Sequence, residues 1–135
     1  AKRFFKLLEG GEVEINASYP AGVIGTTAEN LKEAAEGEHI EWTKLYKNAA
    51  ETAKNEGFEK VAKQFTEIAE VEEKHEIRYR KLLKNIKNRE VFKKEVEVEW
   101  KCRNCGYVHT GKEAPNACPA CDHPQAYFEI KAENY

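Results

Sequence analysis

The sequence predicts a mainly α-helical protein that ends in a small, metal-bound β domain. Apolar residues recur at steps of three and four along residues 27–56 and 58–88, which is the repeat of helices packed in a bundle. After residue 89, apolar and charged residues alternate as they do in a strand, and two Cys-x-x-Cys pairs follow. We therefore expect a helical domain over residues 1–90 and a second, smaller domain over residues 91–135.

The helical domain has three predicted parts. Residues 1–10 place apolar side chains on one face and end on two glycines, as the tail of a truncated helix would, and we expect that helix to begin upstream of Ala1. Residues 12–26 are interrupted by proline and glycine and are expected to form a connector. Thr27 can cap the first long helix and Gly57 can end it, so the short link makes the two long helices an antiparallel hairpin.

The composition narrows the classes of partner and compartment. A formal net charge of -2, with lysine and arginine interleaved with glutamate along the helices, argues against a nucleic-acid partner. No apolar run approaches the roughly 20 residues that cross a bilayer, and the charged residues 1–8 do not form a signal peptide. We expect a cytoplasmic protein without a membrane partner, in which thiols stay reduced.

Four cysteines dominate the second domain. They are Cys102, Cys105, Cys118 and Cys121, and twelve residues separate the two pairs. This spacing suits two turns that hold one tetrahedral ion from opposite sides, and a segment with so few large apolar residues needs such a staple. Zinc and iron both accept four thiolates, so the spacing leaves the metal open, and two disulfides are the alternative.

The residues around the cysteines resemble rubredoxin, an iron-tetrathiolate electron carrier. The resemblance rests on the stretches Cys-Gly-Tyr and Cys-Pro-Ala-Cys and on nearby aromatic residues. It implies an iron ion that carries electrons. Asp122 departs from the pattern, since rubredoxins usually have glycine after each pair. His109 and His123 are surplus to a filled site and are expected at the surface.

Acidic residues interrupt the apolar stripe of both long helices. They are Glu38 and Glu41 in the first helix and Glu72 in the second, where His75 follows. A lone carboxylate in a bundle core costs several kcal/mol unless it is protonated or paired, so three carboxylates and an imidazole at one level call for a shared cation. A Glu-x-x-His step is typical of carboxylate-bridged di-metal bundles, whose oxygen and imidazole ligands suit iron or manganese.

The alternative is that a chain rich in glutamate places some acids near a seam by chance. Coincidence in both helices at matching depth makes that alternative weaker. By the same count His39, Glu73 and Glu76 point away from the seam, and we expect them in solvent.

The whole chain resembles the rubrerythrin family. The resemblance is carried by the stretches Glu9-Gly10-Gly11, Pro20-Ala21-Gly22, Gly37-Glu38-His39-Ile40-Glu41, Glu72-Glu73-Lys74-His75 and Cys102-Arg103-Asn104-Cys105-Gly106-Tyr107-Val108-His109. It implies a ferritin-like four-helix bundle with a non-haem di-iron site, followed by a rubredoxin-like domain. It also implies a peroxidase, linked indirectly to NADH, that reduces hydrogen peroxide to water with electrons from an upstream donor.

The resemblance assigns roles to single residues. Glu38, Glu72 and His75 match di-iron ligands, and Glu41 matches a further carboxylate that lets one iron change its ligand with redox state. Tyr46 matches a tyrosine that hydrogen-bonds the site, although a tyrosine here serves equally well as a packing aromatic. The catalytic residues are thus expected to be Glu41 and Tyr46, and the four cysteines are expected to hold a further iron, for which zinc can substitute.

The chain departs from the family in one respect. Two further helices, which supply another Glu and a second Glu-x-x-His, would lie before Ala1, so half of the di-iron ligands are outside these 135 residues. We expect a polypeptide that supplies them. Since about 20 Å of helix separates His75 from the end of its helix, we also expect a head-to-tail homodimer in which the cysteine site serves the partner's di-iron site.

Two other functions compete with the peroxidase. A ferritin-like iron oxidase or store would use the acids but has no use for a one-electron cysteine site. A zinc-ribbon binding module on a helical hairpin would use the cysteines and leave the buried acids unexplained. The identity of the metal at the cysteines distinguishes between these functions, since iron favours the peroxidase and zinc favours the binding module.

Overall fold

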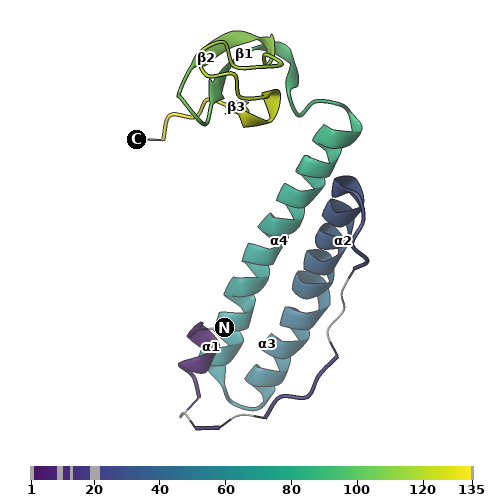
Figure 1. The fold of residues 1–135 in the computed structure, drawn as a ribbon. Helices are drawn as coiled ribbons and strands as arrows, with labels where there is room; N and C mark the ends of the chain where they lie inside the picture. The colour runs from purple at the N-terminus through teal and green to yellow at the C-terminus, as the bar shows by residue number, and fades with distance from the viewer. Residues whose placement is uncertain (1, 9–10, 13, 19–21, 135) are drawn as a thin grey trace. The chain divides into compact units, whose positions relative to one another are not determined.

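The computed structural model describes residues 2–8, 11–12, 14–18 and 22–134, which form two compact units, Ala1–Leu83 and Lys84–Tyr135 (Figure 1). The first unit is helical and the second contains a small antiparallel sheet. The structure confirms the predicted fold class of a mainly helical chain with a small C-terminal β domain. In the described part of the chain, no helix combines the length and the apolar character needed to cross a membrane.

The first long helix is continuous but not uniform. It comprises the α-helix α2 (Thr27–Ile40), a π-helical turn η1 (Glu41–Leu45) and the α-helix α3 (Tyr46–Asn55). A π turn inserts one residue into a single turn while the chain stays helical, and the prediction of one helix over residues 27–56 did not include it. The turn begins at Glu41, one of the predicted ligands.

The predicted cap of this helix was wrong by one residue. Thr26 is the N-cap: its hydroxyl accepts the backbone N–H of Glu29 at 3.3 Å, and the Glu29 carboxylate accepts the backbone N–H of Thr26 at 2.8 Å. This reciprocal pair needs an acid three residues after the cap. Thr27 is followed at that distance by Asn30, whose side chain instead bonds the backbone of Gly25.

The hairpin turn forms as predicted. Gly57 adopts φ +83°, and the N–H of Phe58 donates to the carbonyl of Ala53 at 2.8 Å, which closes the end of α3 in a left-handed cap. The second long helix, α4 (Glu59–Lys87), then runs antiparallel beside α3 and α2 (Figure 1). Of the predicted helical tail at residues 1–10, the structure has α1 (Lys2–Phe5), while residues 9 and 10 lie outside the described part.

The buried side chains of the hairpin are few and mostly small. They are Ala35, Ala53, Ala62, Glu76 and Leu83. The three on α4 are spaced by multiples of seven residues, so they form one stripe along that helix. This stripe faces α2, as the contacts of Glu76 described below require.

The stripe of α4 predicted as the bundle seam runs through Phe65, Glu72, His75 and Leu82, beside the buried stripe, and it is more exposed. Leu82 within it is 40% exposed, whereas Phe65 packs on Phe4 of α1 with ring centroids 4.9 Å apart. The predicted seam was displaced by one residue from the stripe that faces α2. A helix in a bundle has more than one neighbour, and apolar periodicity does not say which stripe faces which neighbour.

The second unit is a three-stranded sheet in the order β2-β1-β3. Its strands are β1 (Lys93–Cys102), β2 (Val108–Glu113) and β3 (Phe128–Ile130), all antiparallel to their neighbours. The core consists of Trp100, Cys102, Ala114, Cys118 and Phe128. The strand predicted after residue 89 is confirmed, whereas β2 lies in a stretch for which the sequence patterns predicted no strand.

We predict that Thr26→Ala lowers the free energy of unfolding of the helical unit by about 1 kcal/mol, because the first turn loses its cap. Urea denaturation followed by far-ultraviolet circular dichroism measures this change. Thr27→Ala is the matched control and should have little effect. An equal or larger loss in Thr27→Ala would contradict the assignment of the cap.

Candidate metal centres

The four cysteines meet between two turns of the sheet unit. The sulfur atoms of Cys102 and Cys121 are 3.8 Å apart, those of Cys105 and Cys118 are 3.6 Å apart, and all four lie within 4.8 Å of one another. A tetrahedral ion with metal–sulfur bonds of 2.3 Å needs sulfur–sulfur distances of about 3.8 Å. The four thiols are free and too far apart for the alternative of two disulfides, and their donor set fits one tetrahedral metal ion.

The thiols differ in their affinity for protons. The backbone N–H of His123 lowers the pKa of Cys121 to about 6. At Cys105 the backbone N–H of Tyr107 acts in the same direction, but neighbouring thiols and burial raise its pKa to about 12. Four thiolates this close repel one another, so a cation is needed to keep them all ionised.

The backbone conformation after the second cysteine pair explains why aspartate can take the place of the usual glycine there. Asp122 adopts φ +58°, and its N–H donates to the carbonyl of Cys118 at 2.8 Å. Gly106 holds the matching position after the first pair, with φ +82°. Aspartate tolerates this left-handed conformation better than most residues, so the turn keeps its shape.

The two surplus histidines lie at the surface of the sheet unit as half-buried side chains. His123 packs edge-on against Tyr127 with ring centroids 4.4 Å apart, and its Nδ1 lies 3.0 Å from the carbonyl oxygen of Cys121. His109 pairs with Trp100 across the two main strands. Their burial follows from the small size of the unit, in which any ring next to the sheet covers part of the core.

In the hairpin, three of the four predicted ligands meet. The Nδ1 of His75 lies 2.7 Å from Glu72 Oε2 and 3.5 Å from Glu38 Oε1, and the three ligand atoms lie within 4.8 Å of one another. Glu38 comes from the last turn of α2, and the other two lie one turn apart on α4. Two carboxylates and an imidazole fit iron or manganese by their donor chemistry.

At this cluster, burial and the neighbouring carboxylates outweigh the opposing effect of the His75 imidazole on the pKa of Glu38 and Glu41. Burial raises the pKa of Glu38, and the negative charge of Glu72 raises it further. Burial and the charge of Glu72 also raise the pKa of Glu41. Carboxylates that share a partly desolvated space in this way favour a bound cation, which removes their repulsion.

Glu41 and Tyr46 lie beside the cluster. Glu41 is outside the group of three whose ligand atoms lie within 4.8 Å. Tyr46 packs on Phe65 with ring centroids 6.0 Å apart, which agrees with its packing role. Burial raises the pKa of Tyr46, as do the charges of Glu41, Glu72 and Glu38, so its hydroxyl keeps its proton and can donate a hydrogen bond.

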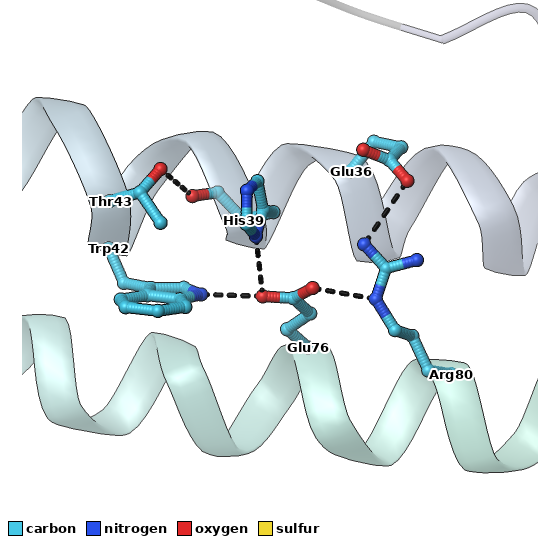
Figure 2. Close-up of polar contacts among 6 residues, drawn as sticks. All are labelled: Glu36, His39, Trp42, Thr43, Glu76 and Arg80. Carbon is cyan, nitrogen blue, oxygen red and sulfur yellow. Dashed lines mark hydrogen bonds and ion pairs between the residues drawn. The ribbon is translucent and has the colours of Figure 1, made fainter.

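The expectation that Glu76 lies in solvent was wrong. Its side chain is buried, with 8% of the residue exposed, and accepts hydrogen bonds from Trp42 and His39 on the facing helix and from Arg80 on its own helix (Figure 2). Counting residues along the predicted seam placed Glu76 outside the interface, because the stripe of α4 that faces α2 lies one residue after the predicted stripe. The seven-residue step from Glu76 to Leu83 and the arginine four residues later were the available signals.

The other two residues expected in solvent are only partly exposed. The side chain of His39 is 45% exposed and that of Glu73 is 40% exposed. Glu73 pairs with Lys74 at 3.0 Å, as a solvated surface acid does.

Taken together, a helical hairpin with an acid–imidazole cluster and a small sheet with four convergent thiols define a class of protein able to hold metal at two centres of different donor chemistry. Two family models match the chain. The one described as "Rubrerythrin" covers residues 1–83, and the one described as "Rubrerythrin, rubredoxin-like domain" covers residues 100–129. The chain belongs to the rubrerythrin family.

Individual relatives agree with this assignment. Rubrerythrin of Porphyromonas gingivalis is 58% identical over 135 residues, which are 100% of this chain and 68% of that protein. Rubrerythrin of Nitratidesulfovibrio vulgaris is 50% identical over 135 residues, again 100% of this chain and 71% of that protein. Rubrerythrin-1 of Clostridium acetobutylicum is 56% identical over 140 residues, with 100% and 71% covered.

Solved structures of nigerythrin share the fold. Those of its partially reduced state and of its fully reduced, all-ferrous state each match with a TM-score of 0.50 and 26% identity. The match covers 96% of this chain and 60% of theirs, so the chain spans less than two thirds of the nigerythrin chain. Family membership, the four cysteines and the Glu/His cluster together point to iron binding.

We predict that removing metal from the four cysteines with a chelator unfolds the sheet unit and leaves the hairpin folded. Two of the five core residues of the sheet, Cys102 and Cys118, are also candidate ligands, so the core depends on the ion. Amide NMR spectra should lose the dispersed signals of residues 93–130 and retain those of residues 59–83. A sheet that keeps its signals without metal would contradict a structural role for the ion.

Proposed function

We propose that this chain is part of a rubrerythrin-type peroxidase that reduces hydrogen peroxide to water. One peroxide, two electrons and two protons give two waters. The observation that supports the proposal most strongly is the presence in one chain of four thiols suited to a one-electron centre and a carboxylate–imidazole cluster suited to a metal pair. A store of iron needs only the second of these, and a zinc-ribbon module needs only the first.

Each side chain has a proposed role. Residues 1–90 form the catalytic domain, where Glu38, Glu72 and His75 supply half of the ligands of a di-iron site and Glu41 supplies a further carboxylate. Residues 91–135 form the electron-transfer domain, in which the four cysteines hold one iron. When bound, iron supplies redox chemistry at both centres: single-electron transfer at the thiolates and two-electron reduction of an O–O bond at the carboxylates.

The remaining residues prepare the site. Tyr46, which keeps its proton because burial and nearby carboxylates raise its pKa, would donate a hydrogen bond to a carboxylate of the site and hold it in one orientation. The other half of the ligands would come from two further helices that a longer form of the chain or another polypeptide supplies.

We further propose that electrons pass between two copies in a head-to-tail homodimer. His75 is followed by about 18 Å of α4 before that helix ends at Lys87, so a short path within one chain is not available along the helix. A partner's four-thiolate centre placed beside the acid–imidazole cluster would shorten the path. The electrons would come from a cytoplasmic donor linked indirectly to NADH.

We predict that Cys102→Ser and Glu72→Ala each abolish peroxide turnover driven by a reduced donor. The first removes a ligand of the electron-transfer centre and the second a ligand of the catalytic centre. Turnover is measured as donor oxidation that depends on peroxide. Glu73→Ala is the matched control, since this neighbouring acid pairs with Lys74 at the surface and should leave turnover unchanged. Full turnover in Cys102→Ser would remove the electron-relay role.

We predict that mixing these two inactive variants restores turnover. In a head-to-tail heterodimer, the intact cysteine centre of the Glu72→Ala subunit lies beside the intact catalytic centre of the Cys102→Ser subunit. Donor-driven turnover after dissociation and reassembly of the mixture measures this effect. If electrons travel only within one chain, the mixture stays inactive.

A further inference from the structure

We propose that Glu76 is a positioning residue that fixes how far α2 and η1 are shifted along α4, and that it thereby holds Glu38 beside Glu72 and His75. This inference rests on the proposed function, because it assigns a task to Glu76 in a site that the chain is proposed to form. It concerns a residue outside the ligand set.

The contacts of Glu76 come from both helices. On the facing helix, Trp42 Nε1 donates to Glu76 Oε2 at 2.5 Å, and His39 Nδ1 lies 3.0 Å from the same oxygen. On α4 itself, Arg80 Nε donates to Oε1 at 2.6 Å (Figure 2). Both oxygens of this buried carboxylate are therefore engaged, and three donors specify one position for it.

A second contact joins the two helices at another position along the hairpin. Arg80 also donates from Nη2 to Glu36 Oε1 at 3.1 Å, which ties α4 to the facing helix a second time (Figure 2). Glu36 and Trp42 are about 9 Å apart along their helix, since each residue advances 1.5 Å. A slip of one helix by a single turn, about 5.4 Å, would break the contacts at both heights.

The apolar part of the interface does not fix this shift. Apart from Glu76, the buried residues of the hairpin are three alanines and Leu83. Alanines form a smooth ridge that can slide with little change in buried area, whereas a buried charge with directed donors has one favourable position. The polar cluster is therefore the main determinant of register among the described residues.

The position of one helix along the other also sets the geometry of the candidate metal site. His39 follows Glu38 in the first helix, and Glu76 follows His75 in the second. The contact between His39 and Glu76 thus sits one residue away, on each helix, from the 3.5 Å approach of Glu38 to His75. Since neighbouring residues of a helix move together, fixing one pair fixes the other.

The test is cobalt(II) binding to the complete protein, in which the other half of the ligands is present, and to the same protein carrying Glu76→Gln. The variant keeps the size of the side chain but replaces one acceptor oxygen with an NH₂ donor, which then faces donors that it cannot bond. Thiolate-to-cobalt absorption reports the cysteine site, and total cobalt minus that amount reports the acid–imidazole site. We expect the variant to bind cobalt at the acid–imidazole site about tenfold more weakly and to bind it unchanged at the cysteines.

Ala62→Gly is the matched control for simple loss of stability. It weakens the same buried stripe four turns away from Glu76 and leaves all polar contacts in place, so its cobalt affinity should stay at the wild-type value. Arg80→Met removes the contact to Glu36 and one of the three donors to Glu76, at a partly exposed position. It should weaken cobalt binding in the same direction by a smaller factor and serves if Glu76→Gln does not fold.

The outcomes separate the two claims. If Glu76→Gln, or Arg80→Met in its place, binds cobalt at the acid–imidazole site as tightly as Ala62→Gly does, Glu76 is not a positioning residue although the site exists. If the unmodified protein binds no cobalt there, the proposed function fails and the positioning role fails with it.

Discussion

Carboxylates and thiols that leave water need a compensating charge, and this requirement organises both units of the chain. In the sheet unit, four thiols lie within 4.8 Å of one another and contribute part of the core, so one bound ion would serve both folding and charge balance. In the hairpin, acids lie on two adjacent stripes of α4. The two stripes meet the requirement in different ways.

On the stripe that faces α2, the buried carboxylate is stabilised by protein groups and needs no metal. Burial alone would raise the pKa of Glu76, yet hydrogen bonds from Trp42, Arg80 and His39 lower it to about 2, so the carboxylate remains ionised and fully bonded. Beside the next stripe, which carries Glu72 and His75, the pKa of Glu38 of α2 is raised, because burial and the charge of Glu72 outweigh the opposing effect of His75. Glu76 is thus fully hydrogen-bonded by protein groups, whereas the carboxylates of Glu38 and Glu72 belong to a cluster that a bound cation would complete.

Sequence patterns predicted the groups that carry the chemistry more reliably than the contacts that hold them. The cysteine pairs and the cluster of Glu38, Glu72 and His75 could be found because ligand spacing is local and survives any detail of packing. The role of Glu76 could not be found in this way, since it depends on which stripe of α4 faces α2. Periodicity defines stripes but assigns no neighbour to them.

The smaller differences have similar causes. The shift of the cap from Thr27 to Thr26 depends on a side chain three residues ahead, and the π turn at Glu41 inserts one residue inside a helix whose two ends stay in place. The strand β2 lies in a stretch rich in turn residues and is stabilised by pairing with β1, which is a non-local interaction.

The central claim is that one chain combines iron at four thiolates with iron at a carboxylate–imidazole site. Mössbauer spectroscopy of the anaerobically purified, iron-57-enriched protein tests it most directly, together with zinc analysis of the same sample. The account predicts two iron environments, one with the signature of four sulfur ligands and one with oxygen and nitrogen ligands. Zinc at the cysteines, or no iron bound by oxygen and nitrogen, would contradict it.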